Sequence, residues 1–486
     1  MTIRDLLPAK HDIVLGYRHP PLRRPVFRLS PEDQSFHATI WGRTGSGKSR
    51  LLQSIFLQHL HAGHGVAILE PHHDLSFDTL ATLVESGFFR DGTAFERLIY
   101  IDWGNDGTSF VPFNVLARTE HPHSIALHAM EAMIRVWPEL RQAPTFQTLF
   151  LSAMVTLITN DLPITNLYQL LSHGESRRQC LEKVTDPLIL QSFAAFDRIR
   201  DQVQEAGSAL RRAFLLSFNP AARLTLGQRD NWLNFRSIMD QGKALIINLG
   251  NIKDGETRRL IGALLLVQIE QAALSRTDIP TNLRRPWTVL LDEWPSFAAT
   301  DKAIATILEQ TRKFGLRLYL AAQSTSQVSS DSLEGAFENC RLNVAFGLGR
   351  KSAVDQSRQL AGGETRRQET KLLARLFAPS PQPEVPYREQ IDTLMQDLQV
   401  LPPQEAYVKL HTAQPARIKA LEVHNPSPAA TELASVLAAY RSRYQRSRTQ
   451  AEARTSPSMQ VHSTAELPAI PFELFSGVRG RAKTFD

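Results

Sequence analysis

The stretch Gly42-Arg43-Thr44-Gly45-Ser46-Gly47-Lys48-Ser49 matches the phosphate-binding loop pattern GxxxxGK[ST]. Its three glycines let the backbone curl tightly, so that successive N–H groups converge on the β- and γ-phosphates of a nucleotide. The lysine adds a positive charge between those phosphates, and the last serine hydroxyl is suited to ligate Mg²⁺. The residues expected to bind the nucleotide are Gly42, Thr44, Gly45, Ser46, Gly47, Lys48 and Ser49.

The segments on either side of this loop have the pattern that such a loop needs. Residues 37–41 are typical of a short buried strand, and 49–60 carry apolar residues at helical spacing. Further along, 65–69 and 98–102 are apolar runs of strand length, separated by a helical stretch. Strand alternating with helix predicts an α/β core with a mainly parallel, doubly wound sheet.

Composition limits the class of protein. A length of 486 residues allows about two to four domains, and a net charge of +6 favours polyanionic partners without proving nucleic acid. Cys180 and Cys340 lie far apart and form no CxxC pair, which fits a reducing compartment. The first residues lack the apolar core of a signal peptide, and the longest apolar runs are too short to span a bilayer. We therefore expect a cytoplasmic protein that reaches the inner face of the cell membrane only through partners.

Strand patterns are confined to two parts of the chain. They disappear from about 122 to 241, where helical periodicity takes over, and return from 244 onward. This arrangement predicts a nucleotide-binding core that is split by an all-helical insertion. The expected parts are a lead-in at 1–34, the first part of the core at 35–120, the insertion at 121–241, the second part of the core at 242–425, and a basic, flexible tail at 426–486 that contains one helix near 430–444.

A second motif indicates that the nucleotide is hydrolysed. Thr288 and the apolar residues 289–291 end in Asp292-Glu293, which is the pattern of a Walker B strand followed by a carboxylate pair. A buried parallel strand delivers such a pair to the carboxyl edge of the sheet, beside the phosphate loop. Asp292 is expected to hold Mg²⁺ together with Ser49, and Glu293 to orient and polarise the attacking water.

Two further residues are candidates for the same reaction. Arg312, just before the strand expected at 316–320, could serve as an arginine finger that neutralises charge on the transferred phosphoryl group. Gln323, at the end of that strand, could sense the γ-phosphate through a hydrogen bond. By the residues alone, each could equally be an ordinary surface or capping group.

Taken in order, these motifs resemble a known family. They are the phosphate loop, Glu70-Pro71-His72-His73-Asp74-Leu75, Pro112-Phe113-Asn114, Leu291-Asp292-Glu293-Trp294, Arg312-Lys313-Phe314-Gly315 and Gln323-Ser324-Thr325-Ser326-Gln327. The combination resembles the DNA-pumping ATPases of the FtsK/HerA superfamily, and within it the conjugative coupling proteins of type IV secretion systems. The likeness covers about residues 30–425.

The resemblance implies a RecA-like core with an inserted helical domain, a homo-hexameric ring with ATP and Mg²⁺ between neighbours, and DNA threaded through its centre. It implies phosphate, magnesium, water-activating, finger and sensor roles for Lys48, Ser49, Asp292, Glu293, Arg312 and Gln323. The chain departs from its relatives at Glu70-Pro71-His72-His73, where they often have Asp-Pro-His-Gly. It also lacks the N-terminal membrane helices of many coupling proteins.

The leading hypothesis is an ATP-driven DNA translocase that delivers a relaxase-bound strand to a conjugative secretion channel. The sequence does not decide between single- and double-stranded DNA. A second hypothesis is a HerA-like translocase or helicase in end processing or phage defence, working with a nuclease. A third is an ATP-dependent switch or scaffold with little turnover, which would not need Glu293. An ATPase that drives protein secretion is a further alternative.

Overall fold

The computed structural model describes most of the chain and divides it into two compact units. The first unit contains residues 1–111, 131–138 and 233–446, and the second contains 112–130, 139–232 and 447–486. The residues that the structure describes are 12–19, 26–104, 107–117, 121–199, 211–214, 216, 218–297, 301–327, 331–361 and 387–455.

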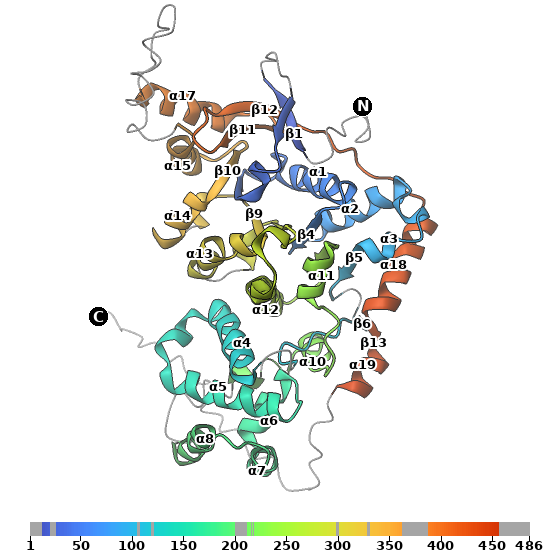
Figure 1. The fold of residues 1–486 in the computed structure, drawn as a ribbon, viewed down its shortest axis with the longest axis vertical. Coiled ribbons are helices and arrows are strands. Elements are labelled where there is room, and N and C mark those ends of the chain that lie inside the picture. The colour runs from blue at the N-terminus through green and yellow to red at the C-terminus, as the bar shows by residue number, and fades with distance from the viewer. Residues whose placement is uncertain are drawn as a thin grey trace, which may run out of the picture. The chain divides into compact units, whose positions relative to one another are not determined.

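The first unit is organised on one large, mainly parallel sheet (Figure 1). The strand order is β2-β1-β12-β11-β10-β3-β9-β8-β4-β7-β5, and every pairing from β10 to β5 is parallel. The predicted α/β core is therefore confirmed. The strands are β1 (Ile13–Arg18), β2 (Val26–Leu29), β3 (His37–Trp41), β4 (Gly65–Glu70), β5 (Leu98–Asp102), β7 (Ala244–Asn248), β8 (Trp287–Leu291), β9 (Leu316–Ala322), β10 (Cys340–Ala345), β11 (Glu405–Leu410) and β12 (Ala416–Ala420).

The order of the strands brings the two sequence motifs to one edge. β9 lies between β3, which leads into the phosphate loop, and β8, which ends before the acidic pair. All residues of β3, β4 and β8 are buried, as expected for parallel strands that are covered on both faces. Because the carboxyl ends of parallel strands meet at one edge, the segments after β3 and β8 come together there.

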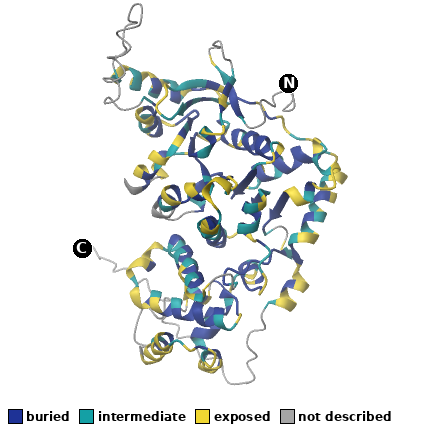
Figure 2. Cartoon of the chain, viewed as in Figure 1, coloured by how far each residue is buried: buried dark blue, intermediate teal, exposed yellow. Residues whose placement is uncertain are grey.

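Helices cover both faces of this sheet. On one face, Leu52, Phe56 and Leu80 from α1 and α2 share a core with strand residues such as Ile68 and Leu290. On the other face lie α11, α12 and α13, and the strands between the two layers are buried (Figures 1 and 2). No helix in the described part of the chain is long and apolar enough to cross a membrane. The helices that lie wholly in this unit are α1 (Lys48–His61), α2 (Asp74–Glu85), α3 (Ala94–Arg97), α11 (Phe235–Gln241), α12 (Gly255–Leu274), α13 (Asp301–Gln310), α14 (Asp331–Ala336), α15 (Arg350–Ala361), α17 (Tyr387–Val400) and α18 (Ala430–Tyr444).

The N-terminal lead-in contributes strands to the sheet. β1 pairs antiparallel with β12 and with β2 at the end of the sheet. The Gln58 side chain of α1 forms two hydrogen bonds with the backbone of Val14 in β1. Val14 N donates to Gln58 Oε1 at 2.8 Å, and Gln58 Nε2 donates to Val14 O at 2.9 Å. Ile13 and Leu15 join the core beneath α1. The described residues of the lead-in therefore form strands of the sheet and contribute apolar side chains to its core.

Residues 430–455 are folded and include the helix that the sequence predicts within the C-terminal segment. The helix expected near 430–444 is α18, and its Tyr440 is 2% exposed and donates a 2.9 Å hydrogen bond to the Leu98 carbonyl of β5. The Tyr440 ring also lies 5.1 Å from the Phe95 ring and 5.9 Å from the Tyr100 ring. Burial of these aromatic rings supplies the free energy that holds the helix on the sheet. The remaining residues, 456–486, lie outside the described part.

The second unit is mostly helical. α5 packs on α6, α7 and α8, and Phe146 and Phe150 stack within α5 at a centroid distance of 4.2 Å. α10 packs on α19, where Gln228 Nε2 donates to the Ala451 carbonyl at 3.0 Å. This unit omits α11 and the residues 131–138, which the sequence assigned to the insertion, and it includes α19 from the expected tail. Its helices are α5 (Pro144–Thr159), α6 (Leu167–Ser172), α7 (Gly174–Leu181), α8 (Pro187–Ile199), α10 (Pro220–Leu226) and α19 (Arg448–Arg454), while α4 (Pro122–Val136) has residues in both units.

Candidate nucleotide-binding site

The phosphate loop joins β3 to α1, and its glycines meet specific steric demands. Gly45 and Gly47 have φ values of 76° and 118°, which a side chain would resist. A Cβ at Gly42 would lie 2.5 Å from Ser46 Oγ and 2.8 Å from Phe346 Cβ. The loop therefore needs glycine at each of these positions, as its sequence pattern predicts.

Lys48 begins α1 and folds its side chain back over the loop. Its Nζ donates to the Gly42 carbonyl at 2.5 Å, and the side chain is buried. Burial lowers the pKa of Lys48, while the nearby carboxylates of Asp292 and Glu293 act in the opposite direction. The lysine thus faces both acidic residues from the loop, which is the arrangement that the two sequence motifs predict.

Ser49 and Asp292 meet across 243 positions of sequence. Ser49 Oγ donates a 3.0 Å hydrogen bond to Asp292 Oδ2, which joins the first turn of α1 to the end of β8. Burial raises the pKa of Asp292, and the hydrogen bond from Ser49 and the charge of Lys48 lower it. A hydroxyl and a carboxylate are hard oxygen donors, so this pair fits Mg²⁺, which takes few protein ligands and completes its shell with phosphate and water.

Glu293 leaves the strand in an unusual conformation. Its φ of 50° and ψ of 53° are left-handed, which is uncommon for a residue other than glycine. In a continuing strand, neighbouring side chains would point to opposite faces of the sheet. The left-handed residue ends the strand, and the Glu293 carboxylate contributes with Asp292 to the electrostatic field at Lys48. Local strain of this kind is often found at functional sites.

The residue that contacts Glu293 is Gln327. Its Nε2 donates to Glu293 Oε1 at 3.2 Å, whereas Gln323, the candidate sensor, is exposed at the end of β9. The short helical turn at Thr325–Gln327 redirects the chain between the two glutamines. Thr325 anchors this turn on α15, because its hydroxyl donates to Asp355 Oδ2 at 2.6 Å. The sequence signal for Gln327 was its place in the same polar block, but spacing alone favoured the residue next to the strand.

Arg312 lies at the opposite edge of the sheet. It precedes β9, whereas the phosphate loop follows β3, and these two strands are parallel. The seven residues of β9, at about 3.3 Å each, separate the two ends by roughly 20 Å. The Arg312 guanidinium stacks over the Phe36 ring at 4.6 Å and is exposed. The structure therefore does not bring Arg312 to the phosphate loop of its own chain.

A buried acid follows the neighbouring strand β4. The Glu70 carboxylate accepts hydrogen bonds from the backbone N–H groups of Leu75 at 2.8 Å and Ser76 at 2.5 Å, at the start of α2. Burial raises the pKa of Glu70 to about 7, against the lowering effect of these hydrogen bonds. This chain has Glu70 where the coupling proteins often have an aspartate, so the position still carries an acid. That acid holds the N-terminus of α2, close enough to Asp292 for the two carboxylates to interact.

The turn after Glu70 is fixed by a polar network. His73, with a φ of 90°, pairs through Nδ1 with Asn248 Nδ2 at 2.5 Å. The same amide donates to Asp102 Oδ1 at 3.0 Å, and Asn251 donates to that oxygen at 2.7 Å. These contacts tie the ends of β4, β7 and β5 together at the edge that carries the phosphate loop.

Comparison with solved structures finds the same fold in proteins of low sequence identity. The plasmid coupling protein TrwB in complex with the GTP analogue GDPNP is 18% identical, with a TM-score of 0.57, over 87% of this chain and 92% of that one. TrwB with ADP and Mg²⁺ is also 18% identical, with a TM-score of 0.55 and the same coverage. VirB4 of Thermoanaerobacter pseudethanolicus is 13% identical, with a TM-score of 0.51, over 87% of this chain and 99% of that one. No family model matches the sequence, and no curated protein matches it. The expected resemblance to coupling proteins is therefore present in the fold.

Proposed function

We propose that this protein is a Mg²⁺-dependent ATPase that moves DNA, acting as a coupling-protein-like motor for conjugative transfer through a type IV secretion system. The observation that carries the proposal is the hydrogen bond of Ser49 to Asp292, with Lys48 and Glu293 in the same cluster. The fold shared with TrwB and VirB4 supports it, and so do the GDPNP, ADP and Mg²⁺ that TrwB structures contain.

In this proposal each residue acts on the nucleotide in a separate way. Backbone N–H groups of the loop bind the phosphates, and Lys48 exchanges its contact with the Gly42 carbonyl for phosphate oxygens. Ser49 and Asp292 hold Mg²⁺, which neutralises charge on the β- and γ-phosphates. Glu293 accepts the proton of the attacking water, and Gln327 holds its carboxylate in place. The role of Gln323 as a γ-phosphate sensor remains a prediction.

The position of Arg312 supports an oligomeric enzyme. Since this residue lies at the edge opposite its own phosphate loop, it can act as a finger only at the site of a neighbouring subunit. Its exposed guanidinium is available for that contact. We propose a homo-hexameric ring in which hydrolysis depends on assembly, with recruitment through partners such as a relaxase and channel components.

The alternatives differ in what they require of this site. A HerA-like translocase or helicase in end processing or phage defence would use the same residues, and it differs in its partners. An ATP-dependent switch or scaffold would not need a water-activating acid, and the contact of Gln327 with Glu293 argues against that reading. The net charge of +6 favours DNA over a protein substrate.

The test is ATP hydrolysis by the purified chain, with and without single- and double-stranded DNA, across a salt titration. We expect DNA to stimulate hydrolysis and the stimulation to fade as salt rises, because non-specific contacts are made mainly to phosphates. Whichever DNA, single- or double-stranded, still stimulates ATP hydrolysis at the higher salt concentration is the one that the motor binds more tightly. Turnover that is indifferent to DNA would contradict the translocase, and no turnover would favour the switch.

A further inference from the structure

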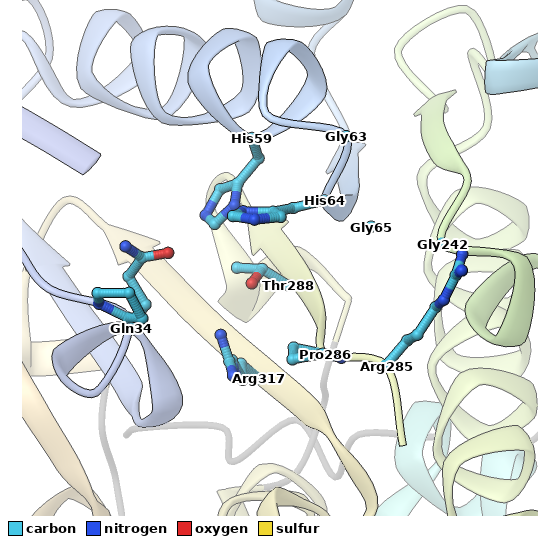
Figure 3. Close-up of a pocket in the computed structure, with 11 residues that line it drawn as sticks. Gln34, His59, Gly63, His64, Gly65, Gly242, Arg285, Pro286, Thr288 and Arg317 are labelled. Carbon is cyan, nitrogen blue, oxygen red and sulfur yellow. The ribbon is translucent and has the colours of Figure 1, made fainter. Parts of the chain in front are cut away.

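A second polar site lies at the amino edge of the sheet, away from the phosphate loop. It is a cavity of about 230 Å³ beneath the C-terminal end of α1. Thr288 near the start of β8 and Arg317 near the start of β9 line it, together with His59 and His64 (Figure 3). The hydrogen bond of Ser49 to Asp292 lies at the opposite ends of α1 and β8, so the cavity is separate from the candidate nucleotide site.

The cavity has a positive lining. Arg317 contributes a guanidinium group, His59 and His64 contribute imidazoles, and no carboxylate is among the lining residues. Figure 3 shows the Arg317 and Thr288 side chains pointing into the space below the two imidazoles. Such a lining attracts anions and repels cations.

Arg317 is a partly buried cation, and no described carboxylate forms an ion pair with it. Among the described residues its guanidinium group makes no hydrogen bond and no ion pair, and burial lowers its pKa. A buried charge is costly unless it is paired and hydrogen-bonded. Arg276, a fully buried arginine in the same unit, shows the usual solution, since its Nε donates to Asp240 Oδ1 at 2.8 Å. A bound anion would give the Arg317 guanidinium the opposite charge and the hydrogen-bond acceptors that Asp240 gives to Arg276.

His59 supplies the second, independent observation. Its side chain is 2% exposed, and neither ring nitrogen has a hydrogen-bond partner. Buried polar groups are rarely left unsatisfied, because each one costs its full desolvation penalty. Burial lowers the pKa of His59 to about 3, so the ring is neutral and keeps one N–H donor. That donor and the Thr288 hydroxyl are available beside the Arg317 charge.

We propose that this cavity binds a small phosphate-type anion, held by the Arg317 guanidinium with hydrogen bonds from His59 and Thr288. Its volume of about 230 Å³ is below the roughly 300–1,000 Å³ typical of pockets for drug-sized ligands. A single phosphate group therefore fits better than a whole nucleoside triphosphate. The anion is either inorganic phosphate or the phosphate of a small monoester, and both present the same oxygens.

The test uses the full chain with saturating Mg²⁺ and ADP, so that the phosphate loop is occupied. Calorimetric titration with inorganic phosphate is compared for wild type, Arg317→Gln and the control Lys313→Gln. Lys313 is exposed before the same strand and does not line the cavity. We expect Arg317→Gln to weaken binding by about tenfold or more, since hydrogen bonds to charged groups are worth about 1.5–3 kcal/mol. Lys313→Gln should change the affinity by less than about threefold, as for other exposed charges.

Three further experiments guard against misinterpretation. If Arg317→Gln fails to fold, His59→Leu replaces it, and we expect at least a fivefold loss of phosphate affinity there. Selenate soaked into crystals of the ADP complex should give an anomalous peak between Arg317 and His59. A repeat titration with adenosine monophosphate separates the sources, because tighter binding than phosphate identifies a monoester and equal binding identifies the free ion. The proposal is overturned if phosphate does not bind beside ADP, or binds equally to wild type and both cavity variants.

Discussion

Replacing Gln327 by alanine isolates one contact of the candidate water-activating acid. Gln327 Nε2 donates to Glu293 Oε1 at 3.2 Å, and Gln327 is exposed. Hydrogen bonds to charged groups contribute about 1.5–3 kcal/mol, and a long, partly solvated one belongs at the low end of that range. A loss of about 1.4 kcal/mol from the transition state lowers kcat about tenfold. We therefore expect Gln327→Ala to hydrolyse ATP about ten times more slowly than wild type.

The nucleotide affinity should stay the same in this variant. In the proposed mechanism Lys48 and the loop backbone bind the phosphates, and among the described residues the Gln327 side chain contacts Glu293 and not the loop. The assay is steady-state hydrolysis with saturating DNA, together with equilibrium binding of a fluorescent ATP analogue. The matched variant is Gln323→Ala, because Gln323 is also an exposed glutamine of the same loop. Wild-type turnover in Gln327→Ala would refute the reasoning, and a selective loss in Gln323→Ala would restore the sequence-based sensor.

Four other substitutions have defined outcomes. Glu293→Gln should bind ATP normally and lose at least about a hundredfold in turnover, because general bases contribute about 10²–10⁴-fold; normal hydrolysis would show that another group activates the water. Arg312→Ala should bind nucleotide without hydrolysing it, and adding Lys48→Ala subunits should restore part of the activity because finger and pocket then meet between chains; a mixture that stays inactive would count against action in trans. Burial raises the pKa of Glu70 from 4.5 to about 7, so the folded state holds this proton more tightly, and the free energy of unfolding should fall by about 3 kcal/mol as pH rises from about 4.5 to 7. Urea unfolding of Glu70→Gln should be less pH-dependent in that window, and an unchanged slope would assign the effect to other groups. Tyr440→Phe removes one buried hydrogen bond to β5 and should destabilise the chain by about 1 kcal/mol in urea unfolding; a larger loss would mean that the ring itself had shifted.

Local patterns predicted most of the nucleotide-binding core. The phosphate loop is a set of backbone demands on adjacent residues, so that Gly45 and Gly47 had to be glycine wherever the loop lies. The apolar run before Asp292 indicated a strand buried on both faces, and parallel strands deliver their carboxyl ends to one edge. For these reasons the fold class was predictable, and so was the position of Asp292 near Ser49. The strand order, with β9 between β3 and β8, explains the hydrogen bond that joins the two residues.

The ends of the chain were the weakest part of the prediction. Residues 1–36 are polar and basic with several prolines, yet apolar residues of β1 and β2 join the core of the sheet beside β12. The helix α18 has a modest apolar stripe, and only the aromatic cluster around Tyr440 shows that it is fastened to β5. Strands and helices at the edge of a core, such as β1 and α18, pack against residues far away in the sequence. Composition does not show which residues those are.

The sequence by itself determined that the chain has a phosphate loop, a Walker B carboxylate pair and a parallel α/β core, because each of these depends on spacing within a few residues. Only the tertiary structure decided which groups meet. It set Gln327 instead of Gln323 on Glu293, it put Arg312 at the edge opposite its own loop, and it enclosed Arg317 with His59. Such meetings depend on strand order, register and the paths of turns, which bring together residues that no local pattern links.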